Sequence, residues 1–205
     1  MEQSFSTLGV IILGAGASSR MGRPKLLLPW HGTTVIGQII GQWRELGARQ
    51  ITVVHRRDDS ALLAELRVQA VPPSHWIENP HPERGMFSSI QCAAHWNGWK
   101  PETAVYAIVL GDQPHLRTDL LRSLLSFQAE HPDAACQPEF EGHARHPVLL
   151  PRRIFEKLRQ TETETLNDFL KQFARSSVQC KINDPSLSLD LDTPEDYKEA
   201  VNRFL

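Results

Sequence analysis

The residues best suited to chemistry follow a short apolar run near the start of the chain. Gly14 and Gly16 lie in a loop of small residues, and Arg20 and Lys25 come shortly after it. Glycines let backbone N–H groups approach a ligand closely, and the two basic side chains add fixed positive charge. The pattern therefore predicts a loop that binds a polyphosphate, such as the triphosphate of a nucleotide.

Two familiar glycine-rich sites fit this loop poorly. Gly9 and Gly14 have the spacing of a Walker loop, but Ala15 stands where that loop needs a lysine. Ser19 stands where a dinucleotide-binding loop has its third glycine, and the strand expected at residues 51–54 is followed by basic residues instead of an acid. One alternative stays open, namely that the glycines serve only the close packing of a turn, but it leaves the basic residues unexplained.

Three carboxylates are candidates for holding a metal ion. Asp112 comes just after the apolar run at residues 105–110, and Asp190 and Asp192 alternate just before a helix expected at residues 194–204. A carboxylate at the end of a buried strand needs a cation or several donors, and magnesium accepts one or two carboxylates with phosphate oxygens and water. The sequence predicts a magnesium site, with two alternatives open: Asp112 as a turn residue and Asp192 as a helix N-cap.

The elements that must position these residues alternate between strand and helix. Strands are expected at residues 9–13, 51–54 and 104–110, and helices at residues 35–46, 61–68, 88–96 and 119–130. Such alternation predicts right-handed crossovers and an α/β fold with three layers, in which helices cover both faces of a mostly parallel, Rossmann-like sheet. The loops after the first and third of these strands would lie at the carboxyl edge of the sheet, where ligands bind in such folds.

The second half of the chain is less regular. Prolines interrupt it around a short strand expected at residues 148–150, and a helix is expected at residues 165–173. We expect a single domain over residues 1–205, with an irregular region at about 132–175 on the acceptor side of the site. The 205 residues, 40% of them hydrophobic and 22% charged, suit one globular domain.

Composition excludes several classes of partner. The formal net charge of −2, with scattered basic residues, offers no basic stripe for nucleic acid, and no apolar run is long enough to span a membrane. The three cysteines are far apart in sequence, which fits neither a disulfide framework nor a zinc site. Residues 1–7 lack the basic start of a secretory signal, and we expect a cytoplasmic protein.

Three motifs together resemble a known family. They are the glycine-rich segment at residues 13–25, Gly-Asp-Gln-Pro at residues 111–114, and Asp-Leu-Asp-Thr-Pro-Glu-Asp at residues 190–196. In this order they are similar to the motifs of the MobA-like nucleotidyltransferases, specifically the molybdenum cofactor cytidylyltransferase branch. The resemblance spans nearly the whole chain, and three separated motifs are far more specific than one glycine loop.

The resemblance implies roles for individual residues. Catalysis would depend on Arg20, Lys25 and Asp112. The nucleotide would be bound by Leu13, Gly14, Ala15, Gly16, Arg20, Lys25, Asn79, Ser89 and Asp112. The metal, Mg²⁺, would be held by Asp112 and Asp192, with an alternative ligand set that adds Asp190, and the acceptor would be contacted by Gln113 and His146. For His146 the alternative is a surface histidine that precedes a proline turn.

The activity implied is transfer of CMP from CTP to a phosphorylated acceptor, with release of pyrophosphate. Within this family the acceptor would be molybdopterin and a further partner could be a molybdoenzyme client. The cytidylyl branch usually reads Leu-Ala-Ala-Gly and the guanylyl branch Leu-Ala-Gly-Gly, whereas residues 13–16 here read Leu-Gly-Ala-Gly. The alternatives are a GTP-dependent transferase, a transferase for a sugar, alditol or other small phosphate, and a non-catalytic protein that delivers a cofactor.

Overall fold

The computed structural model describes residues 7–204 and is built around a mostly parallel sheet. Its strands are β1 (Leu8–Leu13), β4 (Gln50–Arg56), β5 (Trp76–Asn79), β6 (Val105–Leu110), β7 (Ala135–Phe140), β8 (His143–Ala144), β9 (Val148–Pro151) and β10 (Ser177–Lys181). They are ordered β10-β7-β9-β6-β1-β4-β5, and β8 pairs with β7. Strand β9 runs antiparallel between β6 and β7, while β1 pairs in parallel with both β4 and β6.

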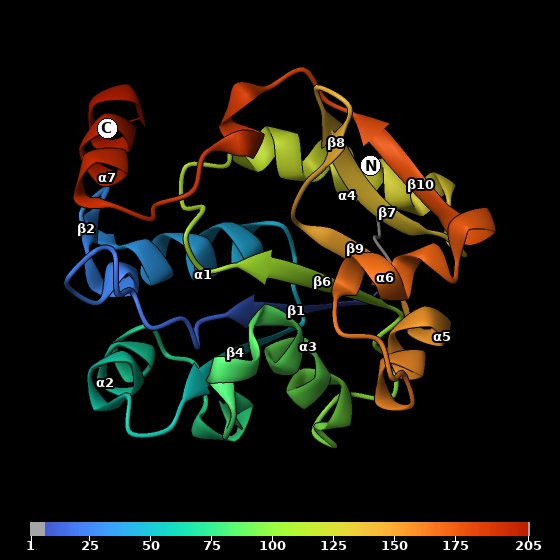
Figure 1. Ribbon diagram of the computed structural model, residues 1–205, viewed down its shortest axis with the longest axis horizontal. Helices are drawn as coiled ribbons and strands as arrows, with labels where there is room; N and C mark the ends of the chain where they lie inside the picture. The colour runs from blue at the N-terminus through green and yellow to red at the C-terminus, as the bar shows by residue number, and fades with distance from the viewer. Residues whose placement is uncertain (1–6, 205) are drawn as a thin grey trace.

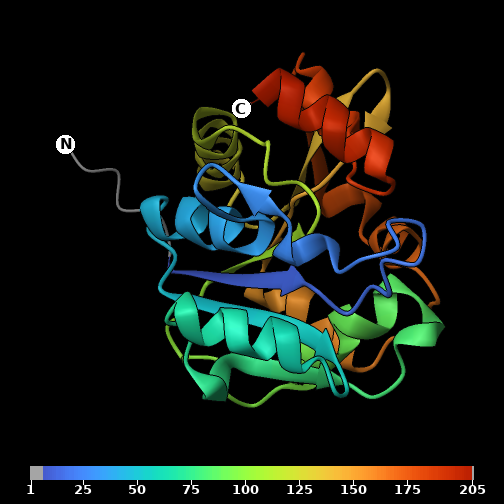
Figure 2. The same ribbon diagram turned by 90° about the vertical axis from the view of Figure 1, so that its left-hand side faces the viewer.

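Helices cover both faces of the sheet, as the sequence predicts (Figures 1 and 2). They are α1 (Val35–Glu45), α2 (Ser60–Val68), α3 (Met86–His95), α4 (Thr118–Glu130), α5 (Arg152–Phe155), α6 (Leu166–Lys171) and α7 (Pro194–Phe204). Short 3-10 turns lie at Lys25–Leu27, Pro73–His75, Pro82–Arg84, Glu156–Arg159, Ala174–Ser176 and Pro185–Ser188, and a small ribbon pairs β2 (Pro29–Trp30) with β3 (Thr33–Thr34).

The buried residues form two clusters because alternate side chains of a strand point to opposite faces. On β1, Val10 and Ile12 pack in the cluster that contains the buried faces of α1 and α4, whereas Ile11 packs in the cluster that contains those of α3, α5 and α6. All three side chains are fully buried. A strand that is apolar on both faces therefore lies at the centre of three layers, and the expected fold class is confirmed.

Helix α1 shows how local sequence sets an element that supports the sheet. The side chain of Thr34 accepts a hydrogen bond from the backbone N–H of Gly37 at 3.0 Å, which caps the first turn. Buried Ile36, Ile40 and Trp43 then recur at helical spacing, and Gly47, with a φ of 84°, follows the end of the helix. The helix thereby starts, packs and stops where the sequence predicts to within one residue.

The second half joins the sheet more extensively than the sequence indicates. The sequence does not predict strands β5, β7 and β10, and β7 contains Pro138, one of the prolines expected to interrupt the second half of the chain. Proline lacks the N–H that a strand ladder uses. The pairing of β7 with β9 is confined to Cys136 and Leu149, so Pro138 lies beyond it and the missing N–H leaves no gap in that ladder.

Two expectations concern the membrane and the start of the chain. Among residues 7–204, no helix combines the length and the apolar character that crossing a bilayer requires. The expectation that the chain starts without a secretory signal concerns residues that lie almost entirely outside the described range.

Gly111 occupies a tight point between the ends of β1 and β6 and provides a test of this packing. A Cβ atom there would lie 2.7 Å from the Leu13 carbonyl oxygen and 2.9 Å from a methyl group of Leu26. We expect Gly111→Ala to lower the free energy of unfolding by about 1–3 kcal/mol in urea denaturation, since backbone must move. Gly41→Ala is the control because that helical glycine has open space around it, and it should leave stability equal or up to about 1 kcal/mol higher. Equal losses in the two variants would contradict the tight packing.

Candidate functional site

A cavity of about 270 Å³ opens at the carboxyl edge of the sheet, where the ends of β1 and β6 lie side by side. It is lined by Leu13, Gly14, Ala15, Gly16, Ser18, Lys25, Leu26, Pro82, Gly85, Met86, Ser89, Leu110, Gly111 and Asp112. The predicted nucleotide-binding residues among these come from three separate segments, namely the glycine loop, the end of β6 and the start of α3. The topology of the sheet therefore gathers into one cavity residues that are far apart in sequence.

The two glycines of the loop have different roles. The N–H of Gly14 donates to the Val54 carbonyl at 2.8 Å, and a Cβ on Gly14 would lie only 3.0 Å from that oxygen. Gly14 is therefore required for packing against β4, as the packing alternative suggests. Gly16 has nothing within 4 Å of the position of a Cβ, so its backbone faces open space that a ligand can use.

The rest of the loop folds back on Ser18. The backbone N–H groups of Met21 and Gly22 donate to the Ser18 carbonyl at 3.1 and 3.2 Å, and the N–H of Lys25 donates to the Ser18 hydroxyl at 3.3 Å. Ser18 itself has a φ of 51°. These contacts hold Arg20 and Lys25 on the side of the loop that faces the carboxylates. Ser18 was not predicted as a site residue, although its place within the glycine loop was the available signal.

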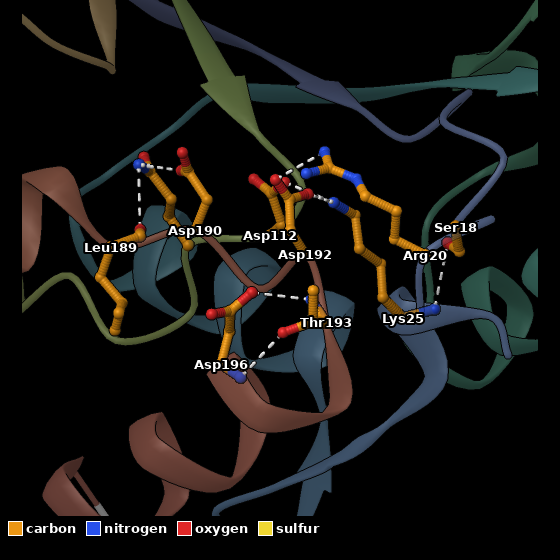
Figure 3. Close-up of polar contacts among 10 residues, drawn as sticks. Ser18, Arg20, Lys25, Asp112, Leu189, Asp190, Asp192, Thr193 and Asp196 are labelled. Atoms are coloured by element: carbon orange, nitrogen blue, oxygen red, sulfur yellow. Dashed lines mark hydrogen bonds and ion pairs between the residues drawn. The ribbon is translucent and has the colours of Figure 1, made fainter. Parts of the chain in front are cut away.

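The carboxylates form an ion-pair network with the two basic residues (Figure 3). The Lys25 ammonium donates to Asp112 Oδ2 at 2.6 Å and to Asp192 Oδ1 at 3.2 Å. Arg20 Nη2 donates to the other oxygen of Asp192 at 2.8 Å. Lys25 and Asp112 have only 15% and 17% of their side chains exposed, so this pair is weakly screened by solvent. The structure thus brings together Arg20, Lys25, Asp112 and Asp192, as the motifs predict.

Titration of the cluster follows from its charges. Burial disfavours the charged form of Lys25, but attraction to Asp112 and hydrogen bonds to Asp112 and Asp192 outweigh it, so the pKa of Lys25 lies above its ordinary value. Loss of hydration, followed by repulsion from Asp112, raises the pKa of Asp190. The Asp190 carboxylate accepts from Gln113 Nε2 at 2.9 Å and forms no ion pair with Lys25.

The residues of this cluster fit a divalent cation. Asp112 Oδ1 is buried and has no hydrogen-bond partner among the described residues, which leaves a carboxylate oxygen free to bind a cation. Within residues 7–204 no group of three or more His, Cys, Asp or Glu side chains is arranged to hold a metal by itself. Asp112 and Asp192 can therefore supply part of a coordination shell that phosphate oxygens and water complete, which is the mode that magnesium favours.

Three predicted contacts lie away from the cavity wall. Asn79 is 1% exposed and donates to Ser89. Ser89 lines the cavity, so Asn79 lies behind Ser89 and away from the cavity surface. Gln113 is buried against Asp190 and the Leu189 carbonyl. His146 Nδ1 faces the Ile108 carbonyl at 3.4 Å, and burial lowers the pKa of His146 despite the nearby charge of Asp112. Gln113 and His146 lie outside the set of cavity-lining residues, so their contact with an acceptor stays a prediction.

The glycine loop also borders a second hollow, of about 280 Å³, which was not predicted. It lies on the side towards α2, and Arg23, Arg56 and Asp59 contribute to its lining. Arg56 Nε is 3.5 Å from Asp59 Oδ2, so part of its positive charge is balanced there. Both faces of the loop are therefore open to ligands, but only the first carries the carboxylate cluster.

Comparison with known proteins places the chain in a family. Residues 10–178 match the MobA-like NTP transferase domain. The chain belongs to that family. As a MobA-like transferase it is a nucleotidyltransferase, and the cavity with its ion-pair network is the candidate site of that reaction.

Relatives of this MobA-like chain span nearly its whole length. The molybdenum cofactor cytidylyltransferase of Escherichia coli (strain K12) is 28% identical over 203 residues, which is 98% of each chain. The molybdenum cofactor guanylyltransferase of Pseudomonas entomophila (strain L48) is 25% identical over 204 residues and covers 95% of this chain and 98% of its own. The crystal structure of Rv0371c from Mycobacterium tuberculosis has a TM-score of 0.77 at 22% identity, covering 97% of this chain and all of its own. A complex of that protein with manganese has a TM-score of 0.67 at 21% identity, over 96% of this chain and 98% of its own.

His115 offers a test of how the Asp112 segment is held. It is 4% exposed, and its Nε2–H donates to the Ser186 carbonyl at 3.0 Å. Burial lowers the pKa of His115 below its ordinary value of 6.5, so the folded protein resists the proton that the unfolded chain accepts. The contribution of His115 to the free energy of unfolding is therefore fully present above pH 6.5 and is lost as pH falls through the lowered pKa.

We expect His115→Gln, which keeps an N–H donor, to show a shallower loss of thermal stability between about pH 7 and pH 5 than the unsubstituted protein. The melting temperatures of the two proteins across this range measure the difference. Parallel curves would show that His115 titrates with its ordinary pKa.

Proposed function

We propose that this protein transfers CMP from CTP to a phosphate group of molybdopterin, with a divalent cation, Mg²⁺, and releases pyrophosphate. The observation that carries the proposal is the carboxylate and ammonium cluster of Asp112, Asp192 and Lys25 at the rim of a glycine-lined cavity. Anionic phosphates need positive charge and backbone donors, and a metal needs carboxylates. The groups that phosphates need and the carboxylates that a metal needs occur here within one site.

The bond changes require little proton transfer. An oxygen of the acceptor phosphate attacks the α-phosphorus of CTP, the bond from that phosphorus to the bridging oxygen of the β-phosphate breaks, and pyrophosphate leaves. The acceptor phosphate is already ionised near neutral pH. Catalysis therefore depends on alignment and on neutralising charge, which Lys25, Arg20 and the backbone amides beside Gly16 would provide.

Asp112 and Asp192 would hold the divalent cation, and Asp190 lies beside them. A bound cation would supply charge neutralisation for the phosphates. Lys25 and Arg20, which pair with these carboxylates in the structure, would then be released to contact phosphate oxygens. A protein with the same fold has been solved with manganese, which supports the choice of a divalent ion.

Cytosine is preferred over guanine for two reasons. The full-length relative with the higher identity is a cytidylyltransferase, and Ala15 occupies the position where the cytidylyl pattern has alanine. A guanylyltransferase is the second candidate because a relative of that name also spans 95% of this chain at 25% identity. Molybdopterin is proposed as acceptor because both of these relatives are named for the molybdenum cofactor.

Asp112→Asn tests the cluster. The substitution keeps the size of the side chain but removes the charge that holds Lys25 and would hold the cation, so we expect turnover to fall roughly 100-fold or more. Pyrophosphate release with CTP, molybdopterin and saturating Mg²⁺ measures it. Asp119→Asn is the control, because Asp119 is exposed and its ion-pair partner, Arg117, is not part of the cluster, and it should leave turnover unchanged. Near-normal turnover of Asp112→Asn would overturn the assignment.

The choice of nucleotide is testable by thermal shift. We expect CTP with Mg²⁺ to raise the melting temperature more than GTP, ATP or UTP does, since a ligand that binds only the native state stabilises it by mass action. Omission of Mg²⁺ should reduce the shift. A larger shift with GTP would assign the protein to the guanylyl reaction, and no shift with any nucleotide would refute the proposal as a whole.

A further inference from the structure

A group of three polar side chains lies at the cavity wall, with Ser89 on its surface and Asn79 and Ser88 behind it. Asn79 ends β5, is 1% exposed, and lies against the first turn of α3, which carries the two serines. Its amide nitrogen is 2.8 Å from Ser88 Oγ and 2.9 Å from Ser89 Oγ, and its amide oxygen is 2.9 Å from the backbone nitrogen of His81. Ser89 is 4% exposed and is the member of the group that lines the cavity.

The direction of each hydrogen bond in this group can be deduced. A backbone N–H only donates, so the atom of Asn79 that faces His81 must be the oxygen, and the nitrogen must face the serines. Ser88 Oγ donates to the carbonyl of Gly85 at 2.8 Å or of His81 at 3.1 Å, which leaves it able to accept from Asn79. One amide hydrogen of Asn79 is thereby used on Ser88.

The second amide hydrogen of Asn79 is then available only to Ser89. Ser89 Oγ therefore accepts from Asn79, and its own hydroxyl hydrogen has to find an acceptor elsewhere. Among residues 7–204, no acceptor for that hydrogen is within hydrogen-bond distance, while Ser89 borders the cavity. A buried donor without a partner is costly unless a ligand supplies the acceptor.

We infer that Asn79 is a specificity-determining positioning residue that fixes Ser89 as a hydrogen-bond donor to the carbonyl oxygen of the bound nucleobase. The inference rests on the proposed function and assigns the nucleobase to this cavity, between the glycine loop and the first turn of α3. Cytosine has one carbonyl oxygen, O2, and that atom is the acceptor we assign to Ser89. Asn79 touches no nucleotide in this arrangement. It acts by making Ser89 Oγ accept from its amide, so that the Ser89 hydroxyl hydrogen is left to donate into the cavity.

Asn79→Asp reverses the direction of the hydrogen bond between residue 79 and Ser89, with almost no change in the shape of the side chain. A carboxylate still accepts from the His81 N–H but has no hydrogen to donate, so the Ser89 hydroxyl turns inward to donate to it. The cavity then loses its donor and presents an oxygen to the base carbonyl. We expect CTP to bind roughly tenfold more weakly by calorimetry, and Ser89→Ala to weaken it by a similar factor.

The double variant separates this role from a merely structural one. If Asn79 acts only through Ser89, Asn79→Asp combined with Ser89→Ala should cost about tenfold, as each change does alone, and not about 100-fold. Ser88→Ala is the matched control, since it removes a hydrogen bond from the same amide without altering Ser89, and CTP affinity should change by less than about twofold. Additive losses, or an Asn79→Asp variant with unchanged affinity, would overturn the inference.

A ligand-side experiment covers the case in which Asn79→Asp fails to fold. The unsubstituted protein should bind CTP roughly tenfold more tightly than 2-thio-CTP, whose sulfur is a weaker acceptor, and Ser89→Ala should bind the two equally. Equal discrimination by both proteins would overturn the inference. If the unsubstituted protein binds GTP in place of CTP, the proposed base preference fails, and the same double-variant cycle with GTP still decides the role of Asn79.

Discussion

The ammonium group of Lys25, held between the carboxylates of Asp112 and Asp192, is the interaction on which the site depends. It joins three segments, namely the glycine loop, the end of β6 and the stretch that precedes α7. Like charges this close repel, and without Lys25 the ion pair left to these carboxylates among residues 7–204 would be that of Arg20 with Asp192. The positive charge thus stabilises the arrangement of acids that a divalent cation and a triphosphate would use.

The sheet is built so that this cluster can form. Because β1 and β6 are neighbours and run in parallel, Leu13 and Leu110 end at the same edge, and the loops that follow them meet. Gly111 allows the loop after β6 to approach the end of β1, because a Cβ there would lie 2.7 Å from the Leu13 carbonyl oxygen, and Gly14 allows the glycine loop to approach the Val54 carbonyl of β4. Packing and chemistry are therefore served by the same short stretches of chain.

Much of this could be predicted from the sequence, for identifiable reasons. The strands and helices of the first half have strong periodic patterns with clear caps, and the three motifs of the site are local in sequence, so the fold class and the convergence of Lys25, Asp112 and Asp192 followed from them. Strands β7 and β10 could not be predicted, because β7 contains Pro138, and whether a proline interrupts a ladder depends on the neighbouring strand. The position of Asn79 behind Ser89 also depends on tertiary packing that no spacing encodes.

The ion pairs of the site also affect how the protein folds. Arg20 and Asp192 are 172 positions apart in the chain, and Lys25 and Asp112 are 87 apart. Contacts between such distant segments form only after most of the intervening chain is ordered, because closing a long loop costs entropy before the contact is made. During synthesis, Asp192 emerges long after the glycine loop, so a growing chain has that loop well before it has a complete charge cluster. Under the proposed function, nucleotide binding would consequently be a late event that reports on completion of the fold.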